Sequence, residues 1–199
     1  MSGAVGALTV RLGVFGGSFD PVHLGHLIVA VEARRQLALD RVLLVPAGRH
    51  PSKPREHASP ADRLAMLRLA VADEPGLAVD DCEIRRGGPS YTVDTLRELR
   101  AERPADSLSL LVGADAAHDL PAWREATTIP TLADIVVLTR PGVPVPRHPL
   151  IARTIEVPAI DISASIVRRR CREGDSVRYF VPDAVARYIA EQRLYADED

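Results

Sequence analysis

The stretch Gly13–His26, GVFGGSFDPVHLGH, joins a short apolar run to a longer segment with helical periodicity. The residues that lead into it, Leu8–Phe15, form an apolar run typical of a buried strand. The residues that follow, His26–Leu39, repeat apolar side chains at helical spacing, with Val31 expected on the inward face. The stretch therefore predicts the turn of a strand–turn–helix unit.

The same alternation continues along the rest of the chain. Further strands are expected at Arg41–Pro46, Leu77–Ile84, Leu108–Val112, Asp134–Thr139 and Thr154–Val157. Further helices are expected at Pro60–Ala72 (after Ser59 as N-cap), Thr92–Glu102, Ser163–Glu173 and Pro182–Arg193. Strands that alternate with helices in this way predict an α/β fold: a Rossmann-like, doubly wound parallel sheet with helices on both faces.

A single domain over residues 1–199 is expected for a chain of this length. Residues 1–8 are expected to be flexible, and residues 163–195 to form a small C-terminal helical part. In that part Tyr188 and Tyr195 are expected to pack beside the core.

Composition excludes several classes of protein. With 46% hydrophobic and 26% charged residues, the chain is globular, and its apolar runs are too short to span a bilayer. The 25 basic and 27 acidic residues give a net charge of −2, so no broad nucleic-acid surface is expected. Two distant cysteines, Cys82 and Cys171, indicate isolated thiols in a reducing compartment, and the first residues lack the basic start of a signal peptide. These features predict a cytoplasmic protein without a membrane partner.

The glycine turn suggests a phosphate site. Gly16 and Gly17 let the backbone approach a ligand closely, and a helix N-terminus follows. His23 and His26 lie three residues apart, so both can donate to phosphate oxygens, and each gains a donor when protonated. An ordinary turn with two surface histidines is the alternative. A zinc site is disfavoured because Asp20 is the one further ligand nearby.

A second anion-binding feature occurs near the C-terminus. Ile162–Arg168, ISASIVR, places Ser163 as the N-cap of a helix, with Arg168 able to form a two-pronged contact with a phosphate. An ordinary serine-capped helix with a solvated basic face is the alternative.

Together, GSFDPVHLGH and ISASIVR resemble the HxGH and ISxxxR motifs of the nucleotidyltransferase superfamily. The segments PSYTVDTL (Pro89–Leu96), LVGADAAHDLPAWREA (Leu111–Ala126) and YFVPDAVARYIAEQRLY (Tyr179–Tyr195) resemble the bacterial nicotinate-nucleotide adenylyltransferases. The resemblance implies transfer of AMP from ATP to nicotinate mononucleotide, giving deamido-NAD and pyrophosphate. The mononucleotide phosphate would attack the ATP α-phosphate directly and in line.

The resemblance also implies a set of site residues. The catalytic residues would be His23, His26 and Arg168. ATP would be bound by Gly16, Gly17, Ser18, Phe19, Gly113, Asp115, Ile162, Ser163 and Ser165. Nicotinate mononucleotide would be bound by Lys53, Thr92, Trp123 and Arg140. Mg²⁺ is expected on the ATP phosphates, with no dedicated protein ligands.

Some of these residues have other interpretations. Asp115 could be a helix N-cap, and Trp123 a core aromatic residue. The family commonly has Ser-Ser-Thr where this chain has Ser163–Ser165, so the role of Ser165 is less secure. Outside the implied set, His50 stands in a basic loop that could lie over the phosphates.

Other functions remain open at this point. The end motifs also occur in phosphopantetheine and nicotinamide-mononucleotide adenylyltransferases. The letters HLGH resemble the HIGH motif of class I aminoacyl-tRNA synthetases, but there is no KMSK-like loop. A nucleotide-sensing module without turnover, and a homo-oligomer, are also compatible with the sequence.

Overall fold

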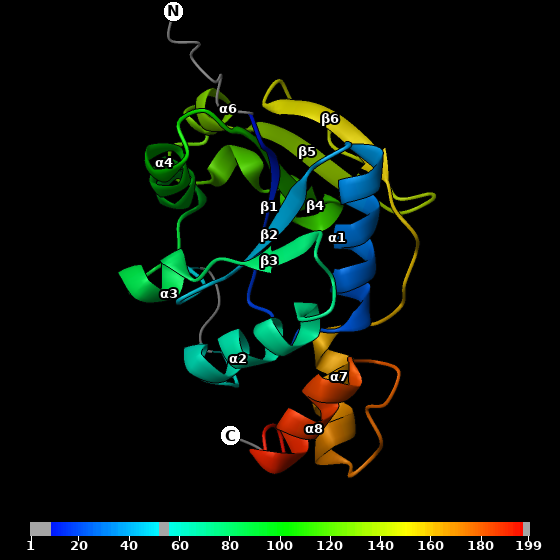
Figure 1. Cartoon of the computed structure of the whole chain (residues 1–199). Coiled ribbons are helices and arrows are strands. Elements are labelled where there is room, and N and C mark those ends of the chain that lie inside the picture. Colours follow the sequence, from blue (N-terminus) through cyan, green and yellow to red (C-terminus); the bar gives the residue numbers. More distant parts are fainter. Residues whose placement is uncertain (1–8, 52–55, 197–199) are drawn as a thin grey trace, which may run out of the picture.

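A computed structural model describes residues 9–51 and 56–196, and it places six parallel strands between two layers of helices (Figure 1). The strands are β1 (Arg11–Gly17), β2 (Arg41–Pro46), β3 (Leu77–Val79), β4 (Ser107–Gly113), β5 (Asp134–Thr139) and β6 (Ile151–Glu156). Their order is β3-β2-β1-β4-β5-β6, and all five neighbouring pairs are parallel. This order confirms the doubly wound, Rossmann-like fold and puts the switch point between β1 and β4.

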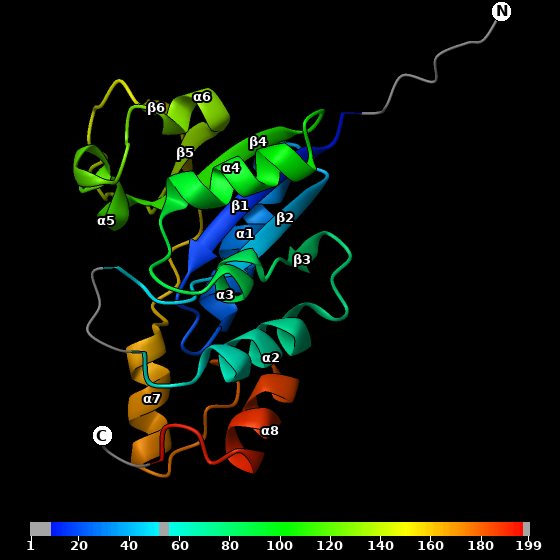
Figure 2. The ribbon, with the colours of Figure 1, turned by 90° about the vertical axis from the view of Figure 1, so that its left-hand side faces the viewer.

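The helices cover both faces of the sheet and one end of the molecule. They are α1 (Leu24–Gln36), α2 (Pro60–Val71), α3 (Cys82–Arg86), α4 (Thr92–Glu102), α5 (Ala114–Ala117), α6 (Ile129–Leu132), α7 (Ala164–Arg172) and α8 (Asp183–Glu191), with a 3₁₀ turn at Leu120–Ala122. Both views show α1 and α4 on opposite faces, and α2, α7 and α8 grouped at one end (Figures 1 and 2).

Two core layers follow from the alternation of side chains along each strand. In β2, Val42 and Leu44 pack into the layer with α1 and α2, while Leu43 and Val45 pack into the layer with α4. A parallel sheet covered on both faces needs apolar residues at successive positions, which is why β2 reads as a continuous apolar run.

Several predicted elements are confirmed by the structure. Arg41–Pro46, Asp134–Thr139 and Thr92–Glu102 have the predicted bounds. Ser59 caps α2 by accepting a hydrogen bond from the Asp62 N–H at 3.1 Å.

The strand predicted at Leu77–Ile84 is too long. It ends at Val79 because the Asp80 carboxylate accepts a hydrogen bond from the Cys82 N–H at 3.0 Å and turns the chain into α3. Strand β6 begins at Ile151, ahead of the predicted Thr154.

The first helix also differs from its prediction. It starts at Leu24, so that His23 is the N-cap, and Val31 is 41% exposed. The helix packs on the sheet through Ala30 and Ala33, which are fully buried. Small side chains let the helix approach the sheet closely. The buried face of α1 is therefore made of alanines, whereas the larger apolar Val31 lies on the exposed side.

Residues 1–8, expected to be flexible, lie outside the described residues. Within the described part of the chain, no helix is both long and apolar enough to cross a membrane.

Candidate active site

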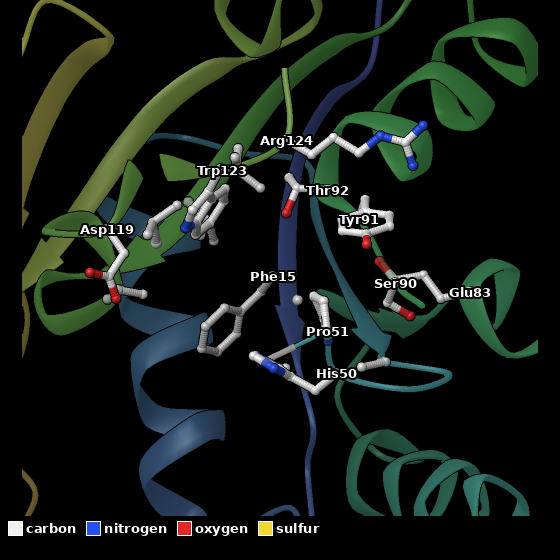
Figure 3. Close-up of a pocket in the computed structure, with 18 of the residues that line it drawn as sticks. Phe15, His50, Pro51, Glu83, Ser90, Tyr91, Thr92, Asp119, Trp123 and Arg124 are labelled. Atoms are coloured by element: carbon white, nitrogen blue, oxygen red, sulfur yellow. The ribbon is translucent and has the colours of Figure 1, made fainter. Parts of the chain in front are cut away.

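A cavity of about 500 Å³ opens at the switch point of the sheet. Its floor is formed by the carboxyl ends of β1 and β4, with Gly16, Gly17 and Gly113 among the lining residues. Ligands of open parallel sheets bind at this position, because the neighbouring loops diverge there. Residues from the α4 N-terminus and from the segment after α5 form the walls (Figure 3).

The structure brings two residues predicted to bind the nicotinate nucleotide to this cavity, Thr92 and Trp123. Thr92 is the first residue of α4, so the cavity faces a helix N-terminus with its positive dipole end. Trp123 is half-buried: it packs against the core layer on the α4 side and also lines the cavity. The two interpretations of Trp123 are therefore compatible.

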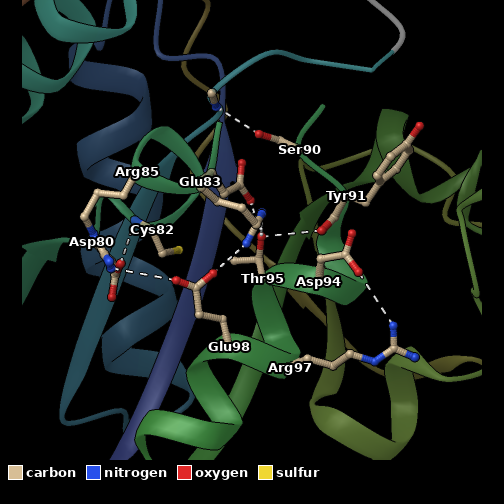
Figure 4. A network of polar contacts seen from close by, with 12 residues as sticks. Asp80, Cys82, Glu83, Arg85, Ser90, Tyr91, Asp94, Thr95, Arg97 and Glu98 are labelled. Atoms are coloured by element: carbon tan, nitrogen blue, oxygen red, sulfur yellow. Dashed lines mark hydrogen bonds and ion pairs between the residues drawn. The ribbon is translucent and has the colours of Figure 1, made fainter. Parts of the chain in front are cut away.

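A partly buried polar network anchors the start of α4 (Figure 4). The Ser90 hydroxyl accepts a hydrogen bond from the Gly48 N–H at 2.9 Å, which ties α4 to the loop after β2. The Thr95 hydroxyl donates to Glu83 Oε1 at 2.6 Å and accepts from Arg86 Nη2 at 3.0 Å. Burial raises the pKa of Glu83 despite the hydrogen bonds from Thr95 and Ser90. The network holds the α4 N-terminus against the cavity.

The two histidines of the first motif stack on each other, with ring centroids 3.7 Å apart. The main-chain N–H of His23 donates to His26 Nδ1 at 3.2 Å. With Nδ1 acting as an acceptor, the neutral His26 ring carries its proton on Nε2. His26 therefore has an N–H donor on the ring atom away from its own backbone.

His23 is buried, with 6% of its surface exposed. Burial lowers its pKa from 6.5 to about 4, so the ring is neutral at physiological pH. Its Nδ1 is enclosed and has no hydrogen-bond partner among the described residues, which leaves Nε2 as the atom able to reach a phosphate. The second donor that His23 would gain on protonation is therefore absent at neutral pH.

We expect His23 to make the fold acid-sensitive. Because its pKa is lowered in the folded state, the unfolded chain binds more protons between pH 6.5 and 4, and stability is lost as the pH falls through that range. The loss assigned to His23 is about 2 kcal/mol between pH 7 and pH 5. Denaturant titrations of the wild type and of His23→Gln, which cannot titrate there, measure it. If the free energy of unfolding changed equally with pH in the two proteins, the assignment to His23 would be wrong.

The second motif lies against the first. Ser163 caps α7 by accepting from the Ile166 N–H at 3.3 Å, as predicted, and its hydroxyl is 2.9 Å from that of Ser165. Arg168 Nη1 donates to the main-chain carbonyl of Asp20 at 2.6 Å. Arg168 is half-buried and bonded to the first motif, so the alternative of a solvated basic face does not describe it.

The residues Ser18–Val22, here called the first-motif loop, are held from several sides. The Ser18 carbonyl accepts from Nη1 of the fully buried Arg63 at 2.7 Å. Phe19 is 2% exposed and packs in the core, so its main chain is the part able to face ATP.

The other predicted residues that the structure describes do not line this cavity, and these include His23, His26 and Arg168. Asp115 is exposed, and its carboxylate lies 4.0 Å from Arg140 Nη2, just beyond the paired ends of β4 and β5. Gly113, not Asp115, is the N-cap of α5, so the capping alternative for Asp115 is wrong. Ile162 precedes α7, and its carbonyl lies near Gly25 of α1. Lys53 lies outside the described residues.

Several cavity residues were not predicted as site residues from sequence. Phe15, Glu83, Asp119 and Arg124 line the cavity, and so does His50, which its basic loop had suggested. Arg124 lies over the Tyr91 ring, 4.7 Å from its centroid. Glu83 stands in a segment whose apolar pattern predicted a strand, and nothing in that pattern distinguished it.

A glycine turn at a Rossmann-like switch point, with Arg168 of the second motif bonded to Asp20 of the first, is the arrangement expected of a nucleotidyltransferase. The chain belongs to the cytidylyltransferase-like family, whose sequence model matches residues 14–170. Curated relatives that match nearly the whole chain carry the same name. A protein from Thermus thermophilus is 49% identical, over 94% of this chain and 100% of its own, and one from Thermomicrobium roseum is 46% identical, over 93% and 91%. Both are named probable nicotinate-nucleotide adenylyltransferase.

Among solved structures, the nicotinic acid mononucleotide adenylyltransferase of Plasmodium falciparum, complexed with NaAD, superposes with a TM-score of 0.77. It is 16% identical, and the match covers 94% of this chain and 97% of that one. At this identity the likeness shows a common fold.

Proposed function

We propose that the chain transfers AMP from ATP to nicotinate mononucleotide, giving deamido-NAD and pyrophosphate in NAD biosynthesis. The observation that carries the proposal is the cavity at the switch point, with Gly16 and Gly17 on one side and the α4 N-terminus and Trp123 on the other. The names of the curated relatives support the same reaction.

The reaction needs no nucleophilic side chain. A phosphate oxygen of the mononucleotide, already anionic, attacks the ATP α-phosphorus, and the bond from that phosphorus to the bridging oxygen of the β-phosphate breaks. The protein orients the two nucleotides and neutralises charge. In this proposal His26 Nε2–H and Arg168 face the ATP phosphates, and His23 Nε2 supplies a neutral contact.

We expect Mg²⁺ to be carried by the ATP phosphates, where it would neutralise charge on the leaving pyrophosphate. In the described ranges no group of three or more His, Cys, Asp or Glu side chains is placed to hold a metal ion. The Asp20 carboxylate accepts hydrogen bonds from the His57 and Ala58 N–H groups and from the Tyr195 hydroxyl.

The substrate's pyridine carboxylate suits the wall formed by the start of α4. The Thr92 hydroxyl and the N–H groups of the first helical turn are donors, and charge-assisted bonds to a carboxylate are about twice as strong as neutral ones. Nicotinamide mononucleotide would turn an amide NH₂ toward donors, an unpaired contact that costs about 1–3 kcal/mol. We therefore expect a strong preference for the acid.

One assay tests the proposed reaction. The purified chain is supplied with MgATP and with nicotinate mononucleotide, nicotinamide mononucleotide or phosphopantetheine, and pyrophosphate release is followed. We expect turnover with the first and about 5- to 150-fold lower kcat/KM with the second, as an unpaired contact of about 1–3 kcal/mol implies. Turnover with phosphopantetheine alone would assign a different adenylyltransferase. ATP binding without release of pyrophosphate for any of the three would indicate a sensing module.

Replacing Trp123 by alanine should weaken both pyridine nucleotides together. The indole can stack on either ring, so we expect the KM of both to rise about 10-fold while their ratio is kept. Trp123→Phe, which retains a stacking face, is the matched control. A selective loss of the nicotinate substrate would show that Trp123 discriminates between the two substrates.

A further inference from the structure

The segment that follows α8 returns to the first motif. After α8 the backbone reverses: Leu194 N–H donates to the Ile189 carbonyl at 3.0 Å, and Arg193 and Tyr195 adopt left-handed φ angles of 51° and 63°. This turn places the Tyr195 hydroxyl 2.7 Å from Asp20 Oδ1, to which it donates. Packing beside the core, expected from sequence, is therefore only part of what Tyr195 does.

Asp20 is the junction that receives this bond. It is 5% exposed, and its carboxylate also accepts from the His57 N–H at 2.6 Å and the Ala58 N–H at 3.1 Å. Its main-chain carbonyl accepts from Arg168 Nη1 at 2.6 Å. One residue thus connects the first-motif loop, the chain before α2, the second motif and the C-terminal end.

The first-motif loop needs such support because its backbone is strained. Phe19 has a φ of +48°, in the left-handed region that side chains disfavour. Strained residues persist where their surroundings over-determine them. Here Arg63 holds the Ser18 carbonyl on one side of Phe19, and the contacts of Asp20 hold the other side.

We propose that Tyr195 is a positioning residue for adenylyl transfer: through Asp20, its hydroxyl sets the course of the first-motif loop and the orientation of Arg168 toward ATP. The inference rests on the proposed function. Burial and the neighbouring Asp20 carboxylate raise the pKa of Tyr195 well above its usual range, so the phenol stays protonated and remains a donor.

The variant Tyr195→Phe removes the hydroxyl and keeps the ring. We expect kcat/KM for ATP to fall about 3- to 10-fold, the effect of one lost hydrogen bond, while the KM for nicotinate mononucleotide is unchanged. The matched control is Tyr188→Phe. Its hydroxyl donates to Asp62 Oδ1 at 2.9 Å, a similar phenol–carboxylate bond of the same helical part, but the other hydrogen bonds of Asp62 join it to Ser59 at the start of α2. The control should change the melting temperature and leave the kinetic constants alone.

Calorimetric titration of each variant with a non-hydrolysable ATP analogue gives a readout independent of turnover, and should show weaker binding for Tyr195→Phe alone. If Tyr195 acts through Asp20, kcat/KM for ATP should fall no further in the double variant Asp20→Asn/Tyr195→Phe than in Asp20→Asn alone. Wild-type kinetics in Tyr195→Phe, equal kinetic changes in both tyrosine variants, or additive losses in the double variant would overturn the proposal. An inactive wild type would instead count against the proposed function.

Discussion

Replacing His26 by alanine is expected to lower kcat by about 10²–10³, the cost of losing one donor to the charge that develops in the transition state. The His23 main chain holds His26 Nδ1 as an acceptor, so its proton lies on Nε2. That donor is fixed before substrate arrives, which is the condition under which a hydrogen bond contributes most to catalysis. Steady-state pyrophosphate release at saturating nucleotides measures the effect.

Stability separates this role from a structural one. The His26 ring also meets the Phe19 ring edge-on, with centroids 5.0 Å apart, so some loss of melting temperature is expected from the lost contact. The exposed His118 provides a control, since His118→Ala should change neither rate nor stability. The unfolded fraction of His26→Ala at the assay temperature is measured as well. If that fraction accounts for the whole fall in kcat, His26 is a packing residue.

Arg168→Lys is the second large effect that we expect, although the charge is conserved. Lysine cannot bind the Asp20 carbonyl and a phosphate oxygen through one planar fork, as the guanidinium can. Losing a charge-assisted hydrogen bond of this kind costs about 1.5–3 kcal/mol, which corresponds to a fall of about 10- to 100-fold in kcat/KM for ATP. The KM for nicotinate mononucleotide should be largely kept.

The same helix offers the matched control. Arg169 and Arg172 are exposed on α7, and within the described residues neither side chain bonds to the first motif, so Arg169→Lys should leave both constants unchanged. Kinetics of Arg168→Lys equal to those of the wild type would show that the two-pronged contact is not needed. A parallel rise in the KM of both substrates would indicate disruption of the whole site.

Local sequence signals were sufficient wherever a residue's role depends on its neighbours in the chain. The apolar run Arg41–Pro46 is a strand because both of its faces are covered, and Ser59 and Ser163 cap helices because their hydroxyls accept from N–H groups three residues on. The prediction failed at Leu77–Ile84, where a hydrogen bond from the Cys82 N–H to the Asp80 carboxylate turns the chain despite the apolar pattern.

The candidate site could be predicted in part, because its glycines and helix starts are short-range features. The resemblance of the two end motifs and of the middle segments supplied the rest of the residues, and the structure places Gly16, Gly17, Gly113, Thr92 and Trp123 around one cavity. Their binding roles stay predictions, to be tested by the substrate assay and the variants above.

The sequence by itself determined the alternation of the main strands and helices along the chain and the doubly wound class of sheet, and it predicted two helix starts as anion-binding sites. Only the tertiary structure decided that His23 is neutral, that Glu83 faces the cavity, and that Tyr195 is bonded to Asp20. Burial depends on the surface that distant segments cover, and the Tyr195 bond spans 175 positions of the chain. Such properties arise from packing of the whole chain, so the periodicity of one segment cannot predict them.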